Sequence, residues 1–291
     1  MPYNFLMGVN TKYKDSVFSF LFSEPDLLRE LYCALEDVSL PPDVPVTINT
    51  LKDVLFLERI NDISFEIGGK LVILIEHQST INPNMGLRLL LYIARVYEKI
   101  IGDKNIYSSK LTRIPRPEFF VLYNGTKPYP EEKILKLSDA FEETGSIGLP
   151  EKNSFALELE VRVININQGK NENLARKCKT LAGYSAFIAK VREFEKECGD
   201  DLKEAVTRAV QYCRENDILK EFLETHSTEV INMLITEWNW DDALEVRYEE
   251  GREDRDEEIA RNALAKGIPL DVIHDITGLD METIKSIQAE V

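Results

Sequence analysis

The clearest alternation of apolar and polar residues lies between residues 61 and 101, where it predicts two strands followed by a helix. Ile63, Phe65 and Ile67 alternate with polar residues, which is typical of a strand with one buried face. Residues 71–75 are a continuous apolar run, which favours a central strand buried on both faces. Gly68-Gly69 between these two segments predicts a hairpin turn. The apolar spacing after residue 84 then changes to that of a helix.

Further strands and helices are predicted on both sides of this segment. Residues 13–22 favour a helix, and a second helix begins near Ser23, with Pro25 in its first turn. Strands are predicted within residues 47–58, at 119–123 and at 155–166, the last one half-buried and nearer an edge, whereas residues 126–150 read as irregular. These elements predict an α/β fold, in which helices pack against a mixed sheet of four or more strands.

No strand pattern follows residue 171, so the remainder is expected to be all-helical. Amphipathic helices are predicted at 175–195 and 202–213, and shorter ones at 217–224 and 228–238. Residues 241–266 are strongly acidic, which indicates a solvated connector or one member of a self-associating helical pair. The last segment predicts two short helices around Gly278, a helical hairpin that we interpret as a docking or oligomerisation element, because its charge is unsuited to reading DNA bases.

Composition narrows the class of protein. The 44% share of hydrophobic residues is that of a globular chain, and no apolar run is long enough to cross a membrane. The N-terminal residues lack the pattern of a secretory leader, and the four cysteines have no metal-ligand or redox spacing. We therefore expect a cytoplasmic protein with reduced thiols. The net charge of −16 argues against nucleic-acid binding, because phosphate contacts normally come from a basic surface.

Candidate chemistry lies where the two central strands end. Glu76 and Gln78 share one face of their strand, whereas His77 points to the other face. A hairpin can place Asp62 beside Glu76, so that two carboxylates and an amide converge. Such a pair of carboxylates is relieved by a divalent cation, and oxygen ligands without thiolates favour Mg²⁺ or Mn²⁺ over Zn²⁺. The alternative is that Asp62 caps a turn with Asn61 and that Glu76 marks where the strand emerges into solvent.

This arrangement resembles the PD-(D/E)xK nuclease superfamily, and most closely its Rpn branch of recombination-promoting nucleases, also labelled putative transposases. The resemblance rests on Asp62, the hairpin, Glu76-His77-Gln78, and a helix with Arg88, Leu89 and Tyr92. It implies a restriction-endonuclease-like sheet, a metal held by Asp62 and Glu76, and a third catalytic residue at Gln78. The superfamily usually has Lys at that third position and Pro before the Asp, whereas this chain has Gln78 and Asn61. The Rpn branch commonly reads Glu-His-Gln.

The resemblance covers roughly residues 13–167. We therefore expect a nuclease-like domain over residues 1–168, a helical extension packed on it over 169–240, and a tail of the acidic helix and helical hairpin over 241–291. The segment around residues 13–22 resembles the family's opening helix, so Lys14 or Asp15 could approach the site, although surface positions are the stronger interpretation for both.

Basic residues follow the proposed site. Arg88, Tyr92, Arg95 and Lys99 form a polar stripe on the predicted helix, which is either an ordinary solvated face or a surface for substrate phosphate contacted by Arg88, Tyr92 and Arg95. Residues 88–116 are rich in Lys and Arg, whereas much of the acid lies at 240–260, which predicts that a basic region adjoins the site.

The resulting hypothesis is a Mg²⁺-dependent DNA endonuclease of the recombination-promoting type, with DNA as its partner and possible self-association through the C-terminal helices. Two alternatives remain open. One is a nuclease fold that has lost catalysis and holds DNA or protein, and the other is an assembly protein organised by the acidic tail.

Overall fold

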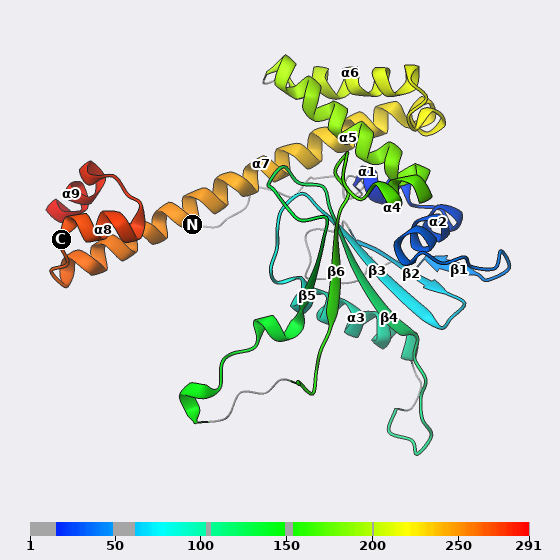
Figure 1. Ribbon diagram of the computed structural model, residues 1–291, viewed down its shortest axis with the longest axis horizontal. Coiled ribbons are helices and arrows are strands. Elements are labelled where there is room, and N and C mark those ends of the chain that lie inside the picture. The colour runs from blue at the N-terminus through cyan, green and yellow to red at the C-terminus, as the bar shows by residue number, and fades with distance from the viewer. Residues whose placement is uncertain (1–15, 49–61, 103–105, 149–153, 200, 291) are drawn as a thin grey trace, which may run out of the picture. The chain divides into compact units, whose positions relative to one another are not determined.

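A computed structural model describes residues 16–48, 62–102, 106–148, 154–199 and 201–290 of the chain (Figure 1). The chain divides into two compact units, Met1–Ile235 and Thr236–Val291. The first unit contains a six-stranded mixed sheet flanked by helices, and the second consists of helices. The chain therefore has the α/β fold with a helical C-terminal region that the sequence predicts.

The sheet combines antiparallel edges with a parallel centre. Its strands lie in the order β1-β2-β3-β4-β6-β5, and β3 is parallel to β4, as β4 is to β6. The other neighbours are antiparallel. The bounds are β1 Val46–Ile48, β2 Asp62–Ile67, β3 Leu71–Gln78, β4 Arg116–Tyr123, β5 Glu132–Lys136 and β6 Glu160–Asn165. The central strand β3 is almost entirely buried, as its continuous apolar run predicts.

The β2–β3 hairpin is confirmed. Gly68 and Gly69 adopt φ angles of 58° and 62°, a left-handed conformation that glycine reaches without steric cost. The turn sets the register, so that Ile67 pairs with Leu71 and, at the far end of the hairpin, Asp62 pairs with Glu76.

Helices cover both faces of the sheet. Helix α3, Met85–Ile101, packs one apolar side against the face that carries Val72 and Leu74, where it forms a core cluster with side chains of β4 and β6 (Figure 1). On the other face, Phe18 of α1 (Val17–Leu21) and Tyr184 of α5 (Lys179–Cys198) contact His77 of β3. Helix α2, Pro25–Glu36, contacts β1, α4 and α5.

Further helices complete the chain. Helix α4 spans Glu172–Lys177 and α6 spans Leu202–Glu215, with α6 packed on α5. Helix α7, Lys220–Ala265, merges the separate helices expected at 217–224, 228–238 and 241–266, with a non-helical residue at His226. Helices α8, Leu270–Thr277, and α9, Met281–Glu290, form the expected hairpin around Gly278. They share a small apolar core with the end of α7.

The structure corrects several sequence expectations. Residues 126–150 are not wholly irregular, because they contain β5 and two 3₁₀ helices, η2 (Leu137–Ala140) and η3 (Gly145–Ile147). Strand β5 is an exposed edge strand of five residues, which leaves little apolar alternation to detect. Strand β6 begins at Glu160 rather than Phe155, since Phe155 and Leu157 are exposed before the sheet begins. Lys14, Asp15, Asn61 and residues 49–58 lie outside the described residues.

Within the described residues, every helix is too short or too polar to cross a membrane.

Candidate active site

The proposed metal ligands meet at the far end of the β2–β3 hairpin. Asp62 on β2 and Glu76 on β3 are direct partners in the antiparallel register. Residues directly opposite each other in such a pair belong to the same face of the sheet, with Cβ atoms about 4.5–5.5 Å apart. The side chain of Asp62 itself lies outside the described residues. The backbone thus brings the two positions together, as the hairpin predicts.

Glu76 is a buried carboxylate whose two oxygens have different surroundings. Only 3% of the residue is exposed. Oε1 lies 2.5 Å from Arg88 Nη2 and accepts a hydrogen bond of 2.6 Å from Gln78 Nε2. Oε2 is buried and has no hydrogen-bond partner among the described atoms. Burial raises the pKa of Glu76 above its usual value, and the charge of Arg88 and the hydrogen bond from Gln78 partly oppose this rise.

The first turn of α3 supplies the groups around Oε1. Gln78 Nε2 also lies 3.0 Å from the sulfur of Met85, the first residue of α3. Arg88, one turn later, donates to the Tyr92 hydroxyl at 3.1 Å, with its guanidinium 5.9 Å from the centre of the Tyr92 ring. Gln78, Arg88 and Tyr92 therefore do gather at Glu76. Sequence reasoning missed Met85, although its position three residues before Arg88 places it on the same side of the helix.

Arg95 does not join this cluster. Its side chain is 56% exposed and pairs with Glu98 at 3.7 Å. Seven residues of helix correspond to about 10 Å along the axis, so Arg95 lies well beyond Arg88 although both occur in the predicted polar stripe. Of the two arginines in the stripe, Arg88 is the one that pairs with Glu76.

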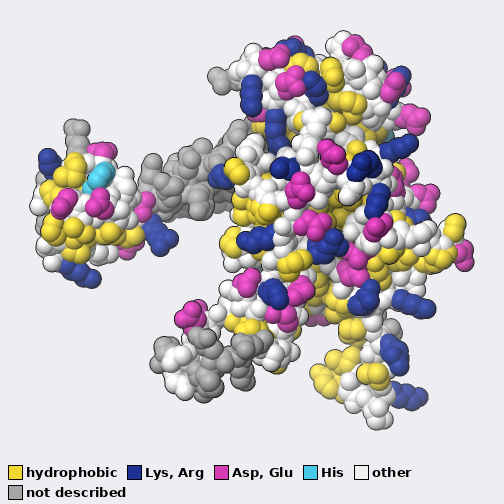
Figure 2. Space-filling view, in the orientation of Figure 1, with side chains coloured by type: hydrophobic (Ala, Val, Ile, Leu, Met, Phe, Trp, Pro, Cys, Tyr) yellow, Lys and Arg dark blue, Asp and Glu magenta, His cyan; other side chains and the backbone are white. Residues whose placement is uncertain are grey.

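The prediction that a basic region adjoins the site is wrong for the residues after α3. Arg116 begins β4 and pairs with Leu71, whereas Glu76 pairs with Val121. Five residues of strand separate these levels by roughly 17 Å. Helix α3 begins beside the end of β3 and returns the chain to the start of β4, which carries the basic loop to the other end of the sheet. Figure 2 shows acidic and basic side chains interspersed on the visible face of this unit.

His77 anchors the same strand to the opposite layer, as alternation predicts. Its ring stacks on Phe18 with centroids 4.8 Å apart, and its Nε2 lies 3.1 Å from the Tyr184 hydroxyl. Burial, with a smaller contribution from the charge of Arg192, lowers the pKa of His77 to about 3. The ring is therefore neutral at physiological pH, and it shares a hydrogen bond with the Tyr184 hydroxyl. Consecutive residues of β3 thus contact different layers of the molecule.

A second polar network closes the carboxyl ends of β4 and β6. Arg192 of α5 donates to Asn124 Oδ1 at 3.2 Å and to Asn167 Oδ1 at 2.9 Å, and it also contacts the carbonyl oxygen of Asn124. Asn124 Nδ2 is buried without a partner among the described atoms. Sequence reasoning missed this network, since only the topology shows that these strand ends face one helix.

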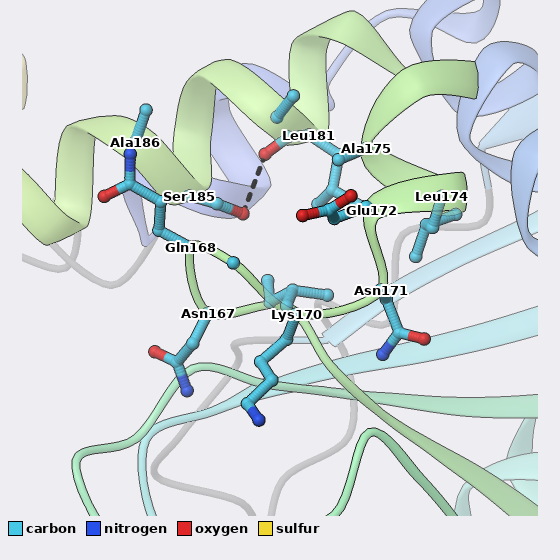
Figure 3. A pocket seen from close by; sticks show the side chains of 13 residues that line it. Asn167, Gln168, Lys170, Asn171, Glu172, Leu174, Ala175, Leu181, Ser185 and Ala186 are labelled. Carbon is cyan, nitrogen blue, oxygen red and sulfur yellow. Dashed lines mark hydrogen bonds between the residues drawn. The ribbon is translucent and has the colours of Figure 1, made fainter.

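A pocket of about 230 Å³ lies beside this network, between the segment after β6 and helices α4 and α5 (Figure 3). Lys170, Asn167 and Asn171 lie along one side of it, and Ser185, which donates to the Leu181 carbonyl at 3.0 Å, along the other. Glu76, Gln78 and Arg88 are not among the residues that line this pocket. It is therefore separate from the carboxylate site.

The donor set at Glu76 fits a hard divalent cation. Oε2 is a buried carboxylate oxygen with unused acceptor capacity, and it belongs to the position directly opposite Asp62. The described residues contain no group of three or more His, Cys, Asp or Glu side chains that could hold a metal. A carboxylate from each of these two paired positions, completed by water, is a ligand set that suits Mg²⁺.

Comparison with known proteins identifies one family. Residues 49–220 match the family described as putative transposase, YhgA-like. This segment contains the β2–β3 hairpin, α3 and strands β4, β5 and β6, and it makes up more than half of the chain. The comparisons with curated proteins and with solved structures gave no match. The resemblance predicted from Asp62, Glu76-His77-Gln78 and Arg88 is confirmed: the chain belongs to the YhgA-like family of putative transposases.

Proposed function

We propose that this protein is a metal-dependent DNA endonuclease that hydrolyses backbone phosphodiesters, with Mg²⁺ or Mn²⁺ as its cofactor. The observation that carries the proposal is Glu76, a buried carboxylate with an unpartnered oxygen, directly opposite Asp62 in the hairpin register. A buried ionised carboxylate is costly unless it is paired or coordinates a metal. Membership of a putative transposase family supports chemistry on DNA.

The chain's own residues have distinct roles in this proposal. Asp62 and Glu76 would hold the metal, which when bound polarises phosphate oxygens and lowers the pKa of a bound water. Gln78 donates to Oε1 of Glu76, so its amide orients the carboxylate and adds no positive charge. Arg88, which is 26% exposed, would contact a substrate phosphate beside Glu76, and the Tyr92 hydroxyl, which is buried and accepts a hydrogen bond from Arg88, would orient its guanidinium.

A nicking assay tests this proposal. Purified protein should relax supercoiled plasmid DNA with Mg²⁺ or Mn²⁺ and not with EDTA. Asp62→Ala and Glu76→Ala should each reduce nicking at least about a hundredfold, because each removes a proposed metal ligand. Glu66→Ala is the matched control, since Glu66 belongs to β2 but pairs with Val72, four residues from Glu76.

The thermal melt distinguishes a lost site from a lost fold. Without metal, Asp62→Ala should melt at or above the wild-type temperature, because it relieves repulsion between two carboxylates. Nicking by both folded variants at the wild-type rate would remove the proposal.

A second candidate is a nuclease fold that binds DNA or protein without cleaving it. It is favoured by the neutral amide at Gln78, where the superfamily usually has lysine, and by Arg88 already occupying Oε1 of Glu76. Calorimetric titration with Mn²⁺ separates the two. Heat of binding that disappears in Asp62→Ala supports the endonuclease, whereas the absence of any heat with the wild type supports the second candidate.

A further inference from the structure

The pairing of Arg88 with Glu76 bears on how the proposed metal site is assembled. A carboxylate oxygen has about two lone-pair positions, and both positions on Oε1 are accounted for by Arg88 at 2.5 Å and Gln78 at 2.6 Å. Oε2 has no partner among the described atoms. One side of the carboxylate is thus already bound to a cation, while the other is open.

Arg88 supplies the positive charge that makes burial of Glu76 tolerable. The Glu76 side chain is only 4% exposed. Among the described groups, Arg88 is the one cation whose charge acts on the pKa of Glu76. Removing one member of a buried pair is strongly unfavourable, because the remaining charge has neither water nor a partner. Arg88 therefore compensates the negative charge of the buried Glu76 carboxylate, as a bound metal ion would.

Arg88 is also placed so that it can leave. Its side chain is 26% exposed, whereas that of Glu76 is 4% exposed, and its contacts besides Glu76 include the Tyr92 hydroxyl at 3.1 Å and the Met85 sulfur at 3.7 Å. Sulfur is a weak acceptor, and a neutral hydroxyl binds a guanidinium less strongly than a carboxylate does. When a divalent cation neutralises Glu76, repulsion between the two cations favours movement of Arg88 toward solvent, because Arg88 is the more exposed side chain of the pair.

Resting on the function proposed above, we infer that Arg88 is an internal counter-ion that exchanges with the metal. It neutralises Glu76 in the metal-free protein, and it gives up that contact and turns to a substrate phosphate once the metal site is filled. Bidentate pairing suits a guanidinium to a phosphate group. The exchange would allow the protein to stay folded with Glu76 buried in the absence of metal, while a cation for the substrate is kept beside the site.

The inference predicts opposite effects of one substitution on stability and on metal binding. Arg88→Met should lower the melting temperature in EDTA, because Glu76 loses its counter-ion. The same variant should bind Mn²⁺ roughly tenfold more tightly in calorimetric titration, because the competing charge is gone. Arg88→Gln, which keeps a hydrogen-bond donor but not the charge, should also bind Mn²⁺ more tightly and guards against a folding defect in the first variant.

Matched variants isolate the pair. Arg95→Met removes an arginine of the same helix that pairs with Glu98 instead, so its Mn²⁺ affinity should equal that of the wild type. Adding Glu76→Gln to Arg88→Met should recover most of the stability lost in EDTA, because no uncompensated charge remains.

The outcomes separate this inference from the proposed function. If the wild type binds Mn²⁺ and the two Arg88 variants bind it equally or more weakly, Arg88 is a fixed structural partner of Glu76 and the exchange is refuted. If neither the wild type nor the Arg88 variants bind Mn²⁺, the proposed metal site fails and the exchange fails with it. Tighter binding by both Arg88 variants, with no change in Arg95→Met, supports the exchange.

Discussion

Replacing His77 with glutamine should remove a large part of the protein's sensitivity to mild acid. The His77 ring is stacked on Phe18, and its Nε2 lies 3.1 Å from the Tyr184 hydroxyl. Its pKa in the folded protein is about 3, compared with an ordinary value of 6.5. Glutamine cannot be protonated in this range, and its side-chain amide can donate a hydrogen bond to the Tyr184 hydroxyl or accept one from it.

The sign and size of the effect follow from linkage. Because folding lowers the pKa of His77, the unfolded chain binds more protons between pH 6.5 and about 3. The contribution of His77 to stability is therefore complete above pH 6.5 and declines as the pH falls toward the folded-state pKa. At about 1.4 kcal/mol per pKa unit, His77 alone should cost about 2.5 kcal/mol between about pH 7 and about pH 4.5.

Urea unfolding of both proteins in EDTA, at several pH values across this window, measures the effect. Other groups titrate in both proteins, including Glu76, whose raised pKa gives a contribution of the opposite sign that stabilises the fold as pH falls. Subtracting the two curves leaves the His77 contribution. His274→Gln, on the exposed side of α8, controls for the loss of one imidazole. Parallel stability curves for wild type and His77→Gln would refute the argument that His77 is held neutral.

Two further predictions concern packing and thiol chemistry. Gly125→Ala should destabilise the fold by about 3 kcal/mol in urea unfolding, because the added Cβ would lie 1.9 Å from the Ser79 carbonyl oxygen, whereas Gly145→Ala, with nothing within 4 Å, should change little. Equal stabilities would show that the loop after β4 can move away. Burial raises the pKa of the Cys178 thiol to about 12 and that of Cys213 to about 11, so iodoacetamide at neutral pH should modify both only after unfolding. Rapid labelling of either in the native protein, mapped by mass spectrometry against the half-buried Cys33 and Cys198, would contradict this.

Local sequence patterns were sufficient to predict the hairpin that organises the candidate site. Gly68-Gly69 and the apolar run of β3 fix the turn and the strand, and alternation then places Glu76 and His77 on different faces. Each of these inferences uses residues that are close together in the chain. The family followed from the same short segment, because the spacing of Glu76, Gln78 and Arg88 reflects that local geometry.

Long-range placement was harder to predict. The helix period puts Arg88 and Arg95 on the same side of α3, so the stripe alone could not distinguish them. Which of the two lies beside Glu76 depends on how α3 packs against the sheet, and the structure shows that it is Arg88. Strand β5 was missed because one exposed edge strand needs few apolar residues, and its pairing with β6 is a tertiary choice. The contacts of Arg192 join residues up to 68 positions apart, which no local pattern encodes.

The alternation along β3 has a consequence for how members of this family can diverge. A residue inserted between Gly69 and Glu76, or one deleted there, would rotate everything beyond it by half a turn. The carboxylate would then face Phe18 and Tyr184, and the imidazole would meet Arg88. Side chains in this interval can therefore be exchanged over evolutionary time, while the number of residues from the turn to the glutamate is held constant. Length variation among relatives is expected in other segments, such as the connection between β5 and β6.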